Sequence, residues 1–586
     1  MGTISDKLMR IINTKEDIRR ALISKGYDVP TSIPFKEYAK MILDLPCKVD
    51  SFPDIEGIVA RYSASGLTNE QMAANPVWVD KTGNGHDLRL KNFAWKGMSG
   101  VGGYEMNFNL WTNNVSSIPD ISMSTTTTSV SVSVGNSTYN NNLIYIHISN
   151  WDINKNHWLK VTSTYEDGDL AFIFYNNSNT KKIGLPANGY VNILAYPEFK
   201  GSYMYISTIS NKQGSFTIEQ LPLYPGALVF DGVDDWAGCD NLPLLPKEKG
   251  YSIIALRNWI TRYDATRYKR PLISNLDTND KGAFLIEYRK DENVNDVTGS
   301  YNSFTDVYID DNNPITWQTS SSYNGQIIKK GTSKSSNKLC ICKTYFGQLS
   351  NYANAAIWEI VILDHDATEE ELTKIKDYFV KAYPWLFPDQ AWTVVGKTNE
   401  DEDRATIANI TGNGNDLVLF NFGFAEGSGY NEEGEYAGYL VTDGVDDKII
   451  SSIFKMGNDW TVIGDWELIN TGKNNNAGIV KFDSIVIYNY NYNSVLINIK
   501  NGRNILIPDQ NTVNAICSDG RIYSKDWKEF IYNEETESTS KNFLTIGYSG
   551  NAYTKIAFKN LAIYPTVLSR EDCIKAYNYL QILKAK

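Results

Sequence analysis

Two short acidic motifs carry the residues most able to do chemistry. Asp231, Asp234 and Asp235 lie in the sequence Asp-Gly-Val-Asp-Asp, and Asp443, Asp446 and Asp447 repeat it exactly in type and spacing. Carboxylate oxygens are ligands that Ca²⁺ accepts. Asp-Gly is also a strong turn signal, because an Asp side chain bonds its own backbone and glycine supplies positive φ. The turn is the favoured interpretation, with Ca²⁺ the open alternative and no other cofactor expected.

Aromatic residues offer a second kind of chemistry. The chain has 14 Trp, 37 Tyr and 22 Phe, and such rings can stack on sugars or pack a sheet. Trp236 follows the first acidic motif, and Tyr488, Tyr490 and Tyr492 alternate with Asn on one face of a predicted strand. Tyr and Asn are adaptable recognition side chains. These four aromatic residues are the candidate glycan contacts, and packing within the sheets is the alternative.

Signals for catalysis are missing from the sequence. The four histidines are scattered, and neither His-Glu-x-x-His nor Gly-x-Ser-x-Gly occurs. Thr82-Gly83-Asn84-Gly85 is followed by an alternating strand pattern instead of the Lys-Ser/Thr and helix of a phosphate-binding loop. No strand carries the paired carboxylates of a glycosidase. We therefore expect no catalytic residues and no enzyme activity.

Charge and hydropathy exclude further classes. Lys and Arg number 56 and Asp and Glu number 68, which gives a net charge of −12, so nucleic acid is a poor partner. No apolar stretch is long enough for a transmembrane helix, and membrane insertion is not expected. The first residues lack the apolar region of a secretory signal, and the six cysteines are few and scattered. Both features indicate reduced thiols and synthesis in a cytoplasm.

An internal repeat defines the organisation of the chain. The twelve residues that begin at Thr82 match those that begin at Thr411 at nine positions, and each copy ends with a strand, a turn and a capped helix start, at Thr368 and Ser569. Gly83 and Gly232 are 149 positions apart in the first copy, whereas Gly412 and Gly444 are only 32 positions apart in the second. The excess reads as short strands and turns, which predicts a small β-sandwich inserted through a loop.

The first 48 residues differ from the rest. Their apolar residues have helical spacing and their helices are too short to build a core alone, so they are expected to pack on another copy or on a partner. The anchoring residues proposed there are Ile18, Leu22, Tyr38 and Met41.

The ordered motifs Thr-Gly-Asn-Gly-x-Asp-Leu, Asp-Gly-Val-Asp-Asp and closing strand with capped helix resemble the laminin-G-like, concanavalin A-like jelly roll. The segment from Thr14 to Tyr38 resembles the helical N-terminal regions of bacteriophage tail and fibre proteins. The resemblance implies a mainly β protein with two jelly-roll sandwiches. The expected domains are a helical anchor at 1–48, a first jelly roll at 49–106 and 226–387, an inserted β-sandwich at 107–225, and a second jelly roll at 388–586.

The function implied by the resemblance is structural. The chain resembles a non-enzymatic component of a phage virion, a tail or head fibre or decoration protein, made in the host cytoplasm. Its N-terminal segment would bind other virion proteins, its sandwiches would bind host-surface glycans, and the family implies a homo-oligomer, with a trimer expected. The alternatives are a secreted or surface-bound bacterial glycan-binding protein and a glycoside hydrolase or depolymerase.

Overall fold

The computed structural model divides the chain into two compact units, Met1–Ile55 and Glu56–Lys586. The residues it describes are 52–105, 112–113, 121–135, 146–147, 157–175, 179–193, 199, 203–208, 213–245, 249–261, 269–277, 284–289, 306–309, 315–319, 326–329, 336–347, 351–434, 436–452, 456–469, 478–482, 485–489, 494–499, 503–508, 513–525, 527–531, 544–548, 553–583 and 585. The proposed anchoring residues Ile18, Leu22, Tyr38 and Met41 lie outside these ranges.

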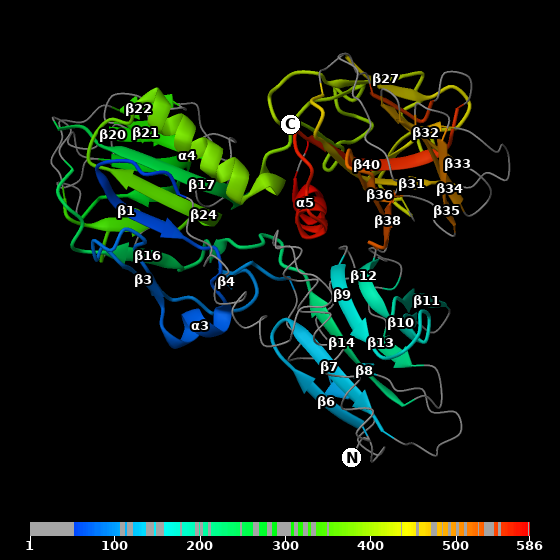
Figure 1. Ribbon diagram of the computed structural model, residues 1–586, viewed down its shortest axis with the longest axis horizontal. Coiled ribbons are helices and arrows are strands. Elements are labelled where there is room, and N and C mark those ends of the chain that lie inside the picture. Colours follow the sequence, from blue (N-terminus) through cyan, green and yellow to red (C-terminus); the bar gives the residue numbers. More distant parts are fainter. Residues whose placement is uncertain are drawn as a thin grey trace, which may run out of the picture. The chain divides into compact units, whose positions relative to one another are not determined.

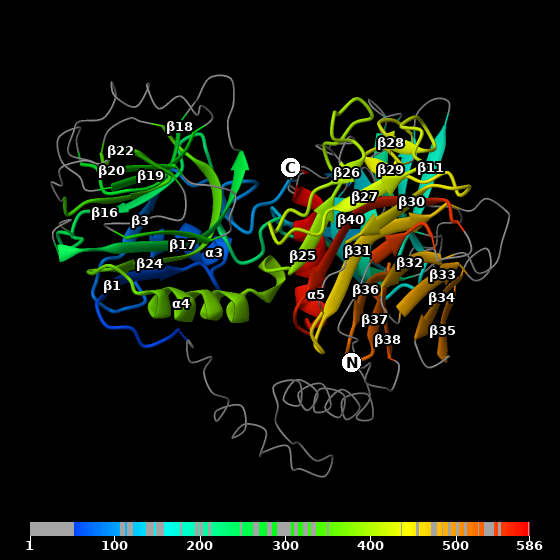
Figure 2. The same cartoon turned by 90° about the horizontal axis from the view of Figure 1, so that it is seen from above.

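The described part is mainly β, and its strands form mostly antiparallel sheets that pair into sandwiches (Figures 1 and 2). We name these the first sandwich (52–104 and 223–387), the middle sandwich (112–220) and the C-terminal sandwich (388–583). Each has a hydrophobic core of its own, to which both of its sheets contribute. No helix in the described ranges is long and apolar enough to cross a membrane.

The first sandwich has two sheets. One has the order β21-β17-β24-β15-β4, with β1 also paired to β24. Its strands are β1 (Ile58–Ser63), β4 (Gly100–Val101), β15 (Leu228–Asp231), β17 (Ser252–Thr261), β21 (Ile315–Thr319) and β24 (Asn354–Leu363). The other has the order β2-β3-β16-β23-β18-β19-β20-β22. Its strands are β2 (Val77–Trp78), β3 (Leu88–Lys91), β16 (Trp236–Cys239), β18 (Lys269–Ser274), β19 (Phe284–Arg289), β20 (Asp306–Ile309), β22 (Gln326–Lys329) and β23 (Leu339–Ile341).

Helices complete the first sandwich. They are α3 (Asn69–Ala74), α4 (Glu369–Ala382) and the short 3₁₀ helix η5 (Pro384–Leu386). Thr368 and Glu371 form a full capping box at the start of α4, as the sequence predicts. The helix runs along one face of the sheet that contains β17 and β24 (Figures 1 and 2).

The C-terminal sandwich repeats this topology. Its first sheet has the order β36-β31-β40-β29-β28, with β25 also paired to β40 and with β37 and β38 continuing beyond β36. These strands are β25 (Gln390–Thr393), β28 (Gly429–Asn431), β29 (Tyr439–Val441), β31 (Thr461–Leu468), β36 (Val513–Cys517), β37 (Arg521–Ser524), β38 (Glu529–Ile531) and β40 (Ile556–Tyr564). Helix α5 (Arg570–Ile582) follows β40 as α4 follows β24, and Ser569 caps it.

The second sheet of the C-terminal sandwich has the order β26-β27-β30-β39-β32-β33-β34-β35. Its strands are β26 (Thr406–Ile407), β27 (Leu417–Phe420), β30 (Lys448–Ser451), β32 (Gly478–Phe482), β33 (Ile485–Asn489), β34 (Ser494–Ile499), β35 (Arg503–Pro508) and β39 (Leu544–Ile546). The two copies diverge at its far edge, where β19 and β20 pair in parallel but β33 and β34 are antiparallel.

The middle sandwich lies in the chain between β4 and β15. Its two sheets have the orders β11-β10-β13-β8-β5 and β12-β9-β14-β7-β6. The strands are β5 (Thr112–Asn113), β6 (Ile121–Thr125), β7 (Ser129–Val134), β8 (Ile146–His147), β9 (His157–Ser163), β10 (Leu170–Tyr175), β11 (Thr180–Leu185), β12 (Asn188–Ile193), β13 (Tyr203–Thr208) and β14 (Gly214–Gln220). In β7 the valines of Ser-Val-Ser-Val-Ser-Val are buried, as a period of two predicts.

The chain enters and leaves the middle sandwich at one place in the first. Strands β4 and β15 are antiparallel neighbours. Beyond them, Gly102 donates its N–H to Ala227 (2.9 Å), and Leu223 donates to Gly103 (3.0 Å). The two crossings of the chain are therefore held to each other by backbone hydrogen bonds within the first sandwich.

Candidate functional site

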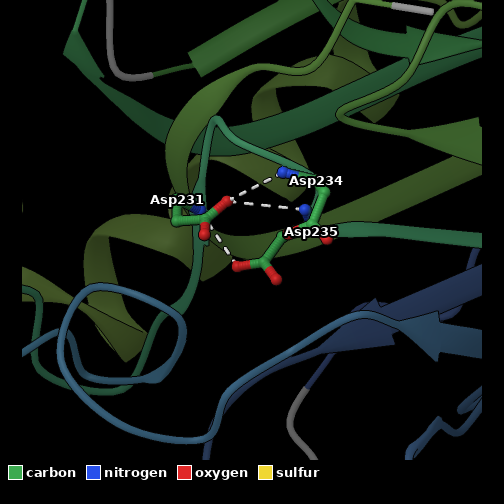
Figure 3. Close-up of side chains that lie close together, drawn as sticks. All are labelled: Asp231, Asp234 and Asp235. Atoms are coloured by element: carbon green, nitrogen blue, oxygen red, sulfur yellow. Dashed lines mark hydrogen bonds between the residues drawn. The ribbon is translucent and has the colours of Figure 1, made fainter. Parts of the chain in front are cut away.

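The first acidic motif is a turn closed by its own carboxylates (Figure 3). Asp231 Oδ1 accepts hydrogen bonds from the backbone N–H groups of Val233 (2.8 Å), Asp234 (3.3 Å) and Asp235 (3.4 Å). Asp235 Oδ2 accepts the N–H of Asp231 (3.1 Å). Gly232 takes φ +75°, where a side chain would also meet Asn354. These contacts form the predicted turn.

The second acidic motif has the same geometry. Asp443 Oδ1 accepts from Val445 (2.7 Å), Asp446 (3.2 Å) and Asp447 (3.3 Å), and Asp447 Oδ2 accepts from Asp443 (2.8 Å). In each motif three carboxylates come within 4.8 Å of one another. Asp231, Asp234, Asp235, Asp443, Asp446 and Asp447 thus stay a hypothesis as Ca²⁺ ligands, with the turn as their observed role.

Burial shifts the pKa of one carboxyl in each motif. Burial raises the pKa of Asp235 to about 7, with Asp231 and Asp234 adding to the rise and a hydrogen bond from Ser99 opposing it. Burial also raises the pKa of Asp447, although the Ser428 hydroxyl opposes it. Within the described residues, Oδ1 of each of these two buried carboxyls has no hydrogen-bond partner.

The Trp236 ring makes a cation–π contact with a buried lysine. The Nζ of Lys343 lies 4.0 Å from the centre of the Trp236 ring, and Phe346 meets that ring edge-on at 5.7 Å. The residue is half-buried, and Lys343 is 4% exposed. This cation–π contact fixes the chain that follows β23 to the sheet. The role of Trp236 in glycan binding stays a prediction, and the observed role is packing.

The C-terminal sandwich has the same pairing with the partners exchanged. Lys448 follows the second acidic motif as Trp236 follows the first, and Tyr548 follows β39 at the position of Lys343. The Nζ of Lys448 lies 5.5 Å from the Tyr548 ring centre and 5.4 Å from that of Phe420. A cation and an aromatic ring therefore occupy the same two topological positions in both copies.

The predicted tyrosine stripe is only partly described. The backbone of Tyr488 lies in β33, and Tyr490 and Tyr492 fall outside the described residues. Their role in glycan binding remains a prediction.

A cavity of about 530 Å³ opens at one end of the first sandwich. The loops before β1, before β3, before β17 and after β24 enclose it. It is lined by Gly57, Ile58, Val59, Asn84, His86, Pro243, Leu244, Leu245, Lys249, Gly250 and Asp364. We call it the loop pocket. It combines an imidazole, an ammonium group and a carboxylate with an apolar wall.

Hydrogen bonds hold the Thr82–Asp87 loop rigidly beside the loop pocket. Asn84 Nδ2 donates to the backbone carbonyl of Val59 (2.9 Å), and Asn241 Nδ2 donates to that of Gly85 (2.9 Å). The Tyr62 hydroxyl donates to the carbonyl of His86 (2.5 Å). The Thr-Gly-Asn-Gly motif therefore positions a pocket wall, in addition to forming the loop that its sequence predicts.

Three polar side chains and one leucine of the loop pocket can meet a ligand. Asp364 Oδ1 lies 3.2 Å from His365 Nδ1, which orients the carboxylate. His86 Nδ1 is buried and has no hydrogen-bond partner in the described part of the chain. Lys249 is exposed, and Leu244 is 63% exposed beside it. The sequence held one signal for this pocket, because His86 stands where the second copy has Asn415.

Comparisons with known proteins give only distant structural matches. No protein-family model matches the chain, and no curated protein matches it. Trypanosoma rangeli sialidase in complex with sialic acid aligns at 9% identity over 79% of this chain and 85% of that one, with a TM-score of 0.25. The botulinum neurotoxin type G receptor binding domain aligns at 12% identity over 32% and 50%, with a TM-score of 0.21. The botulinum neurotoxin serotype C1 binding domain aligns at 11% identity over 59% and 91%, with a TM-score of 0.20.

Proposed function

We propose that this protein is a non-enzymatic structural component of a phage virion, a tail or head fibre or decoration protein that displays lectin-like domains to host-surface glycans. The first and C-terminal sandwiches would be laminin-G-like, concanavalin A-like jelly rolls, which the repeated motifs and the repeated strand orders support. The loop pocket carries the binding part of the proposal, because it joins polar groups to an apolar wall on a rigid scaffold.

The side chains of the loop pocket suit a sugar ring. Asp364 would accept hydrogen bonds from ring hydroxyls, and Lys249 and His86 would donate to or accept from others. Leu244 would cover an apolar C–H face of the ring. Since side-chain hydrogen bonds to backbone carbonyls already fix the Thr82–Asp87 loop, little entropy is lost when it contacts a ligand.

Replacing Asp364 or Lys249 by alanine should lower glycan affinity by about tenfold or more, which corresponds to the loss of one good polar contact. Binding is measured on an array of bacterial surface oligosaccharides and then by calorimetry with the best of them. Lys374→Ala, an exposed lysine of α4 in the same sandwich, is the control and should bind as the parent chain does. Unchanged affinity in both pocket variants would remove the loop pocket from the proposal. Shortening of the bound oligosaccharide during incubation would favour the depolymerase alternative.

Attachment to the particle is proposed to lie in residues 1–48. Removing them should leave soluble, folded sandwiches that no longer co-sediment with virions, because each described sandwich has its own core. Light scattering would then also show whether the expected trimer depends on this segment. Virions that still incorporate the shortened chain at the parent level would contradict the division of roles.

A further inference from the structure

The C-terminal sandwich exposes apolar side chains where the first sandwich exposes charges. Val418 and Phe420 point away from the core on β27 and are 39% and 42% exposed. Arg89 and Lys91 hold the equivalent outward positions on β3, and both are exposed. The repeated fold therefore accepts cations at these positions and does not require apolar residues there. Val418 and Phe420 therefore add exposed apolar area to this face of the C-terminal sandwich that the repeated fold does not require.

A lysine lies between aromatic rings on the same face. The Nζ of Lys448 is 5.4 Å from the centre of the Phe420 ring and 5.5 Å from that of Tyr548. Tyr548 in turn packs on Tyr553, with ring centres 4.9 Å apart. Lys448, Tyr548 and Tyr553 are all partly exposed, whereas Lys343 in the first sandwich is buried. We call Phe420, Lys448, Tyr548 and Tyr553 the aromatic–lysine face.

We propose that the aromatic–lysine face binds a saccharide that carries carboxylate groups, such as a chain of uronic acids. Aromatic rings accept the C–H face of a pyranose and contribute apolar contact area. The Lys448 ammonium group supplies the charge that is complementary to a sugar carboxylate, in a charge-assisted hydrogen bond. A neutral sugar would offer the Lys448 ammonium group no charged partner. This inference rests on the proposed role in glycan adhesion, but it uses a different sandwich and none of the residues of the loop pocket.

The test uses the full chain and an array of uronate-containing oligosaccharides, each paired with its carboxyl-reduced form. We expect the acidic form to bind about tenfold more tightly than its reduced partner, and its affinity to fall as salt is raised. Lys448→Gln should bring the affinity for the acidic form down to that for the reduced form. Phe420→Thr should weaken both forms, because it removes the ring. Lys91→Thr, at the matching position of the first sandwich, should change neither.

Three results would overturn this inference. The first is that no acidic oligosaccharide binds more tightly than its reduced form. The second is that Phe420→Thr, with native circular dichroism, binds as tightly as the parent chain. The third is that no sugar binds and the chain self-associates through this face, which light scattering would show as dissociation of the parent oligomer by Phe420→Thr. Asp364→Ala separates the two sites, since it should leave acidic-sugar binding here intact even if the loop pocket binds nothing.

Discussion

Replacing Arg61 by alanine is expected to destabilise the first sandwich by about 3–5 kcal/mol, because the change leaves the Glu359 carboxylate buried without its cation. Arg61 Nε donates to Glu359 Oε2 (3.3 Å), and both side chains are nearly or fully buried. Urea unfolding would measure the loss of stability, and hydrogen exchange of the β17 and β24 amides would assign that loss to the first sandwich. The other two sandwiches should unfold as in the parent chain.

Tyrosines of α4 and its C-terminal end complete the buried ion pair. Tyr383 donates its hydroxyl to Glu359 Oε1 (2.8 Å), and Arg61 donates to the Tyr378 hydroxyl (2.8 Å). Burial, with the Glu359 charge, raises the pKa of Tyr383, so this tyrosine stays a donor at any physiological pH. The network therefore joins the sheet to α4, and its loss should expose α4 to exchange first.

The C-terminal sandwich supplies the matched control for Arg61. Strand registers place Ala391 at the position of Arg61 and Asn560 at that of Glu359. The double variant Arg61→Ala, Glu359→Asn removes both charges and introduces the residue types of Ala391 and Asn560, which occupy these positions in the C-terminal sandwich. It should recover most of the stability that Arg61→Ala loses, since no uncompensated charge remains. If the single and the double variant are equally unstable, the ion pair is not the source of the loss.

Replacing Asp235 by asparagine is expected to stabilise the first sandwich at pH 8 and to flatten its stability between pH 4 and 7. Asp235 is fully buried and its folded pKa is raised to about 7, while an unfolded aspartate ionises near about 3.9. As the pH rises, the unfolded chain loses its proton first, so folding becomes steadily less favourable up to the folded pKa. At about 1.4 kcal/mol per pKa unit, the penalty reaches roughly 4 kcal/mol above pH 7.

Asparagine preserves the turn in this experiment, because its carbonyl oxygen can still accept the Asp231 N–H. Thermal unfolding from pH 4 to pH 8 gives the measurement, with hydrogen exchange of β15 and β16 to assign the transition. Asp447→Asn makes the same change in the C-terminal sandwich, where burial also raises the aspartate pKa, and should shift only that transition. The prediction is contradicted if the parent chain's first sandwich becomes more stable relative to Asp235→Asn as the pH rises from 4 to 7.

The sequence predicted those turns and helix starts that depend on contacts between residues close together in the chain. The Asp-Gly-Val-Asp-Asp turns and the capped starts at Thr368 and Ser569 depend on side chains within four residues of their targets. The mainly β architecture followed from the same kind of short-range pattern. The repeat of Thr82–Phe93 at Thr411–Phe422 pointed to a duplicated sheet order, which the strand pairing has.

The candidate sites could not be predicted in the same way, because distant segments build them. The loop pocket joins residues near positions 57, 85, 245 and 364, and no pattern within any one of these segments indicates a cavity. The two copies also exchange an aromatic ring and a lysine: Trp236 contacts Lys343 in the first, and Lys448 contacts Tyr548 in the second. A sequence alignment shows this only as two unrelated mismatches, Trp236 with Lys448 and Lys343 with Tyr548. The strand pairing registers were needed to show that these positions are equivalent and in contact.

The adjacency of β4 and β15 has a consequence for how such a chain can diversify. The chain leaves the first sandwich after β4 and re-enters it at β15, and these two strands are neighbours. Backbone hydrogen bonds between Gly102 and Ala227 and between Gly103 and Leu223 hold the two connections to each other. The first sandwich is therefore closed at the point where the middle sandwich is inserted. A cassette of different origin spliced between these crossings would keep the hydrogen bonds that join them, although it would lose the contacts of Trp158 with Tyr577 and of Asp167 with Lys528. Recombination at this junction would exchange one middle domain for another in a single event, while the hydrogen-bonded ends of β4 and β15 stayed as they are.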